Sequence, residues 1–158
     1  MNQIDQHTLE VLEWPAIQAR LAALAGSPVG RELAQGIHPL PTLEEAKKVR
    51  NEVEEFRALL SRETALPFDQ LFDIRESVRR SRPEGAVLAA MDFVRVATSL
   101  EAAAAIRHAI ARSRNLCPQL HAIASRLDGH TDLVEEIHAA IDASGEFKDT
   151  ASRKLGQL

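Results

Sequence analysis

Apolar residues recur at alternating steps of three and four positions between residues 42 and 61, and this spacing constrains the fold more than any other feature of the chain. Such steps place side chains on one face of an α-helix. Thr42 and Glu45 match the capping box that begins many helices. The remaining faces carry mixed charges, so the apolar face is narrow and requires a facing helix, as in a coiled coil. This face, here named the apolar stripe, comprises Ala46, Val49, Val53, Phe56 and Leu60.

Helical patterns extend over almost the whole chain. The longest predicted helix spans residues 89–114 and is apolar on nearly all sides, which is typical of a helix at the centre of a bundle. Pro15, Pro28 and Pro118 each suit the first position of a helix and mark three further starts. A short hairpin is expected around Gly145. We therefore predict an all-α multi-helix bundle, folded as a single domain over residues 1–158.

Composition excludes several classes of protein. The formal net charge is −4, which excludes a strongly basic nucleic-acid binder at the level of the whole chain but leaves local basic patches open. No apolar run reaches membrane-spanning length, and residues 1–14 contain no apolar signal region. Cys117 is the single cysteine and cannot form an internal disulfide. These features predict a cytoplasmic protein with no membrane partner.

The chain lacks the sequence motifs of the common catalytic and cofactor sites. It has no GxxxxGK[ST] phosphate-binding loop, no GxGxxG after a strand and no CxxC pair. The six histidines form no HxxxH pair with a nearby glutamate. Cys117 precedes Pro118 at a helix start, where a thiolate could be stabilised, but a small apolar filler is the simpler interpretation. We predict no catalytic residue, no bound cofactor and no metal ligand in this chain.

Two groups of arginines are the candidate nucleic-acid contacts. The first group is Arg79, Arg80 and Arg82, and the second is Arg107, Arg112 and Arg114. Both groups lie near the ends of predicted helices, where basic residues also stabilise the helix dipole and add solubility. Phosphate contact is the functional alternative. From the residues alone, dipole stabilisation and solubility are the favoured explanation.

The apolar stripe is the candidate surface for self-association. A stripe with this spacing needs a facing helix, so an incomplete core leaves it or the helix over residues 89–114 uncovered. Symmetric pairing of two copies is the common solution. We therefore expect a homo-oligomer, with Val49, Val53, Phe56 and Leu60 as the packing candidates.

Several segments, taken in order, resemble the N-terminal region of the MutS-two family, the recombination-suppressing branch of the MutS proteins. The order begins with the Leu-Glu-aromatic opening of "TLEVLEW", followed by "LAGSPVGRELA" and "PLPTLEEA". "FDIRESVRRSRPEGAVL" follows, and "GEFKDTAS" is the most specific single piece. The resemblance covers nearly all of the chain. Pro15 and "RKLGQL" depart from the family pattern.

The resemblance implies a role that the residues alone do not show. Family members are homodimeric ATPases with a core domain, levers, a clamp and a C-terminal Smr nuclease module. They bind branched DNA and limit recombination, and some act on collided ribosomes. The chain would then be a non-catalytic part of the core, with residues 145–158 beginning a lever or clamp helix that continues beyond Leu158. ATP and Mg²⁺ would belong to the parent protein, an ATPase and endonuclease. The alternative is a free-standing helical domain that docks a partner protein.

Overall fold

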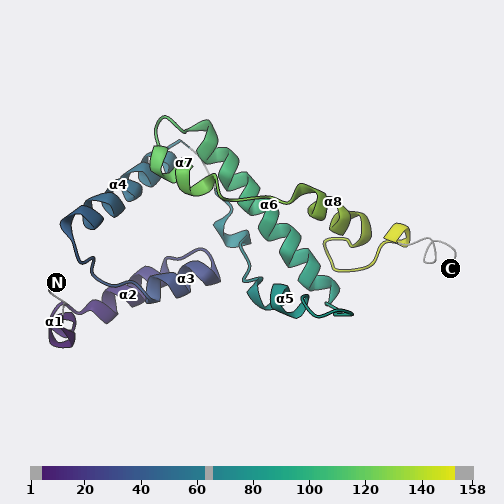
Figure 1. The fold of residues 1–158 in the computed structure, drawn as a ribbon, viewed down its shortest axis with the longest axis horizontal. Coiled ribbons are helices and arrows are strands. Elements are labelled where there is room, and N and C mark those ends of the chain that lie inside the picture. Colours follow the sequence, from purple (N-terminus) through teal and green to yellow (C-terminus); the bar gives the residue numbers. More distant parts are fainter. Residues whose placement is uncertain (1–4, 63–65, 152–158) are drawn as a thin grey trace.

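The computed structural model describes residues 5–62 and 66–151, and within these residues the fold is all-α, as predicted (Figure 1). No residue of the described part lies in a strand; the backbone forms α-helices joined by turns and two short 3₁₀ helices. The elements are α1 (Gln6–Val11), α2 (Trp14–Ala23), α3 (Pro28–Gln35), α4 (Leu43–Leu60), η1 (Phe68–Gln70), α5 (Arg75–Arg80), α6 (Ala90–Arg112), α7 (Pro118–Ala124), α8 (Thr131–Ala140) and η2 (Asp149–Ala151).

Side-chain caps determine where several helices begin. Asp5 accepts a hydrogen bond from the backbone N–H of Thr8 at 2.8 Å and caps α1. Ser27 Oγ accepts the N–H of Gly30 at 3.1 Å at the start of α3. Thr42 Oγ1 accepts the N–H of Glu45 at 3.2 Å at the start of α4. These oxygens satisfy N–H groups that have no partner inside the helix, so each cap stabilises its helix start.

Helix α6 is the centre of the structure, as its sequence predicted. α7 packs near one end of α6 and α8 packs along another part of it (Figure 1). Ala97, Ala102 and Ala109 are buried on α6, and their small side chains let neighbouring segments approach closely. Gly129, between α7 and α8, is one such close approach, because a Cβ there would lie 2.9 Å from the Cβ of Ala104. The small residues of α6 therefore set how tightly the surrounding helices pack.

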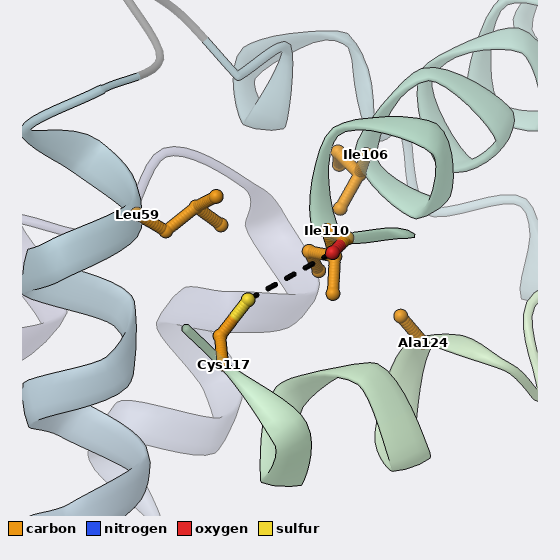
Figure 2. Close-up of a cluster of buried hydrophobic side chains, with 5 residues drawn as sticks. All are labelled: Leu59, Ile106, Ile110, Cys117 and Ala124. Carbon is orange, nitrogen blue, oxygen red and sulfur yellow. Dashed lines mark hydrogen bonds between the residues drawn. The ribbon is translucent and has the colours of Figure 1, made fainter. Parts of the chain in front are cut away.

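Two clusters of buried side chains hold the helices to α6. The first joins α4, α6 and α7 (Figure 2) and consists of Leu59, Ile106, Ile110, Cys117 and Ala124. The second joins α6 to α8 and consists of Ala97, Val134 and Ile137. Burial raises the pKa of the Cys117 thiol, and the Glu55 carboxylate raises it further. Cys117 is thus a buried neutral filler, and its thiol donates to the carbonyl of Ser113 at 3.1 Å.

Helices α1 to α3 pack mainly on one another. Trp14 Nε1 donates to the carbonyl of Ile37 at 3.1 Å, and Gln18 Nε2 donates to the same carbonyl at 2.7 Å. These bonds hold the end of α3 against α2. The link to the remaining helices includes a close backbone approach, since a Cβ on Gly26 would lie 3.2 Å from the Cβ of Phe68.

The hairpin expected near Gly145 is present as a tight turn with one antiparallel bridge, between Ile141 and Phe147. Asp142 donates its N–H to the carbonyl of Glu146 at 2.9 Å. Gly145 has a φ of +84°, which disfavours other residues, and a Cβ there would collide with Met91. The turn therefore packs against the start of α6. Of the predicted lever segment 145–158, residues 152–158 lie outside the described residues.

The apolar stripe of α4 is not the face that the helix buries most deeply. Leu59, which the spacing left out, is 0% exposed, whereas Leu60 is 48% exposed. Val49 and Val53 are 42% and 51% exposed, and only Phe56 packs into the first buried cluster. α7 contacts the side of α4 that carries Glu55 and Leu59, which lies about a third of a turn from the centre of the stripe. The spacing identified the stripe as a surface that needs a facing helix, but it did not identify Leu59 as the residue that this helix buries most deeply.

Candidate nucleic-acid interface

The first arginine group lies on and just after α5, which is anchored to the start of α6 by Asp92. Ser77 Oγ donates to Asp92 Oδ1 at 3.1 Å, and Arg80 Nη2 lies 3.4 Å from Asp92 Oδ2. The same carboxylate accepts the N–H of Ala89 at 3.2 Å. Asp92 is mostly buried, so Arg80 neutralises a carboxylate that has little water around it. Part of the function of Arg80 is therefore to hold α5 in place.

Arg79 is also paired. It forms an ion pair with Glu76, one turn earlier on α5. Arg82 follows the helix, is exposed, and has no ion pair within residues 5–62 and 66–151. Of the three predicted arginines in this group, Arg82 is the one whose charge is available to a phosphate without breaking an existing pair.

Arg75 organises the other side of α5. Its guanidinium bonds both Glu32 of α3 and Asp73, with Nη2 2.6 Å from Asp73 Oδ2. These bonds lower the pKa of Asp73 to about 2 and also lower the pKa of Glu32. Arg75 therefore joins α3 to α5 across the surface. Its positive charge is already offset by two carboxylates.

The second arginine group lies at the far end of α6. Arg107 is half-buried, and its Nη1 donates to the carbonyl of Leu127 at 3.1 Å, which ties α6 to the segment after α7. Arg112 and Arg114 are exposed at the end of the helix. Arg112 and Arg62 line a recess of about 290 Å³. The recess places Arg112 of α6 near a second basic side chain, Arg62, which follows the end of α4.

The two arginine groups do not form one surface. Asp92, which anchors α5, and Arg112 lie near opposite ends of α6, and a helix of that length separates them by roughly 30 Å. The two arginine groups are therefore too far apart to contact the same phosphates of a DNA duplex. The structure thus gives two small candidate contacts instead of one extended basic stripe.

Sequence comparison relates the chain to larger proteins. No protein-family model matches the chain. The Endonuclease MutS2 of Thermus thermophilus is 37% identical over 150 residues, which cover 95% of this chain and 19% of that protein. The Endonuclease MutS2 of Bacillus velezensis is 33% identical over 155 residues, covering 96% of this chain and 20% of that protein. That of Pelotomaculum thermopropionicum is 32% identical over 155 residues, covering 98% and 20%.

By sequence, the chain belongs with the MutS2 proteins. The resemblance inferred from its motifs is confirmed over nearly its full length. The chain spans about a fifth of the length of these MutS2 relatives.

Within residues 5–62 and 66–151, no three His, Cys, Asp or Glu side chains are grouped as metal ligands. No helix in the described ranges combines the length and hydropathy needed to cross a membrane. His138 Nε2 and Glu101 Oε1 lie 3.0 Å apart and join α8 to α6, so this histidine has a packing partner that the sequence did not identify.

One polar contact, between α4 and the start of α7, was not predicted from the sequence. Glu55 of α4 accepts the N–H groups of Gln119 and Leu120, at 3.3 Å and 3.0 Å. The glutamate therefore caps α7, whose own N-cap residue, Cys117, provides no side-chain oxygen. Capping signals are read within four residues, whereas these partners are 64 and 65 residues apart. No local pattern could have found the contact.

Proposed function

We propose that the chain is a non-catalytic helical module of a MutS2-type protein, forming part of its core and the beginning of a lever. The observation that carries the proposal is the match to MutS2 endonucleases over about 95% of the chain. In this proposal the parent binds branched DNA, limits recombination and acts as an ATPase and endonuclease. Collided ribosomes are a second substrate class for the same parent.

The arrangement of the helices supports a positioning role. α6 is long, and separate neighbours pack on it through compact buried clusters. Four of the acidic side chains around α5 and the end of α3 neutralise arginines; they are Glu32, Asp73, Glu76 and Asp92. Any contact of this module with nucleic acid would therefore be weak and salt-dependent. ATP and Mg²⁺ would be bound by other parts of the parent, in a cytoplasmic homodimer.

A protein-docking module is the second candidate. It is favoured by large apolar side chains that remain exposed at the end of α2 and on α3 and α4, including Leu24, Leu33 and Val53. Exposed apolar surface of this kind marks contact with another protein surface. The two candidates are compatible if the docked surface belongs to the same MutS2 assembly.

A chimaera tests the proposal. The segment of Thermus thermophilus MutS2 that aligns with this chain would be replaced by residues 1–151, and DNA cleavage would be compared with the parent and with a version lacking the segment. We expect the chimaera to cleave DNA and the deletion to lose cleavage. A folded chimaera without cleavage, or a fully active deletion, would contradict the proposal.

A further inference from the structure

The exposed part of the apolar stripe has no partner within the described chain. Val49, Val53 and Leu60 lie on one side of α4 and remain about half exposed. Assigned to heptad positions, Ala46, Val53 and Leu60 are at a, and Val49 and Phe56 are at d. α7 packs on the flank of α4 that carries the g residues Glu52 and Leu59, and the a/d seam itself stays open over the first turns of α4.

The charges beside the seam are arranged by sign. Arg50 and Arg57 occupy the e positions, and Glu45 and Glu52 occupy the g positions. Glu45 and Arg50 are both exposed, and Arg50 has no ion pair within the described residues. Among the residues that the structure describes, Arg57 pairs only with Glu54, through an exposed contact one turn away at 3.0 Å. The seam is therefore bordered by acidic side chains on one side and basic side chains on the other.

We propose that α4 pairs in parallel and in register with α4 of a second copy of this chain. In a parallel pair, each g residue faces the e residue five positions further on in the other helix. Glu45 then faces Arg50 of the second copy, and Glu52 faces Arg57. An antiparallel pair would place e beside e and g beside g, which brings arginine to arginine and glutamate to glutamate. The signs of the flanking charges thus favour a second copy of α4 as the partner helix, in parallel orientation and in register.

The pairing is short. Phe56 is partly covered by Phe68, whose ring centroid lies 5.8 Å away, so the seam narrows towards the end of α4. Coiled coils are typically inferred from three to four or more consecutive heptads, and α4 has only 18 residues. The contact is accordingly a weak, reversible one that strengthens when the two copies are held together elsewhere. It is independent of whether the chain has the role proposed above.

Sedimentation across a concentration series tests the pairing and its charge pattern. We expect the dimer fraction of the 158-residue chain to rise with concentration. Arg50→Glu places like charges at two symmetric contacts and should weaken dimerisation about tenfold. Adding Glu45→Lys should restore it, although that change also removes the capping bond from Thr42. Lys47→Glu makes the same charge change on the opposite side of α4 and should leave the dimer unchanged.

Disulfide trapping tests direction and register. Val49→Cys places two thiols side by side only in a parallel, in-register pair, and we expect it to form linked dimers on oxidation. Lys47→Cys is the matched control and should not. The native Cys117 is fully buried and does not compete. Three results would each overturn the proposal. The chain could stay monomeric up to about 1 mM, or Glu45→Lys could fail to restore the dimerisation that Arg50→Glu weakens. The third result is disulfide-linked dimer that forms no faster with Val49→Cys than with Lys47→Cys.

Discussion

The carboxylate of Glu55, on α4, accepts the backbone N–H of Leu120 in the first turn of α7 at 3.0 Å. The same carboxylate accepts the N–H of Gln119 at 3.3 Å. One side chain therefore satisfies two N–H groups that α7 leaves unpaired and fixes the angle at which α7 meets α4. The buried cluster around Leu59 forms directly beside this contact.

Replacing Glu55 should destabilise the fold. Glu55→Ala leaves the start of α7 without its acceptor, and we expect the free energy of unfolding to fall by about 1–2 kcal/mol. Urea denaturation followed by circular dichroism measures the change. Glu54→Ala is the control, because Glu54 forms an exposed pair with Arg57, and this substitution should cost less than about 0.5 kcal/mol. Equal losses in both variants would show that the cap contributes nothing.

The adjacent leucines of α4 should respond very differently to truncation. Leu59→Ala removes a fully buried side chain from the α4–α6–α7 cluster and should cost about 2–5 kcal/mol. Leu60→Ala removes a half-exposed side chain and should cost about 1 kcal/mol or less. The same denaturation experiment measures both. A larger loss at position 60 would mean that the stripe, and not Leu59, forms the core of this helix.

The contrast between Leu59 and Leu60 shows which features of the fold can be predicted from the sequence alone. The helical class, the capped start of α4 at Thr42, the central position of α6 and the turn at Gly145 follow from local patterns, and all were predicted correctly. The choice of Leu59 over Leu60 depends on where α7 docks. Both residues fit a helical repeat, so local spacing could not distinguish them.

Less of the candidate nucleic-acid interface could be predicted from the sequence. The arginines could be identified by type, but their availability depends on carboxylates that are distant along the chain, such as Glu32 beside Arg75. The distance between the two arginine groups along α6 also depends on how α5 packs against Asp92, which the sequence does not reveal. Long-range partners of this kind leave no periodic signal.

Acid should release the contact between Asp73 and Arg75. The pKa of Asp73 is lowered to about 2 by its hydrogen bonds with Arg75, so this contact stabilises the fold above the usual carboxyl pKa of 3.8 and is lost as the pH falls towards 2. Arg75→Gln should return the pKa of Asp73 towards 3.8, and carboxyl NMR titration measures it. Arg82→Gln removes an arginine that has no ion pair in the described part of the chain, and it should leave the pKa of Asp73 unchanged. If the pKa of Asp73 in the Arg75→Gln variant stayed at its wild-type value, the pairing would be ruled out.

Binding to branched DNA should be weak and depend on a small number of arginines. We expect the combined replacement of Arg79, Arg80 and Arg82 by Ala to lower the affinity for a fluorescent four-way junction and to reduce the slope of log affinity against log salt by about one unit per lost contact. Arg82→Ala alone should account for most of the change, because Arg79 and Arg80 are paired. Arg114→Ala tests the other group. Unchanged affinity in the triple variant would leave these arginines as ordinary surface.

The non-catalytic role is tested most directly by assaying the purified 158-residue chain for ATP turnover and plasmid nicking with Mg²⁺ or Mn²⁺. We predict rates equal to buffer for both reactions and no stoichiometric binding of ATP. Turnover or nicking that co-elutes with the folded chain on size exclusion and disappears on heat denaturation would contradict the central claim.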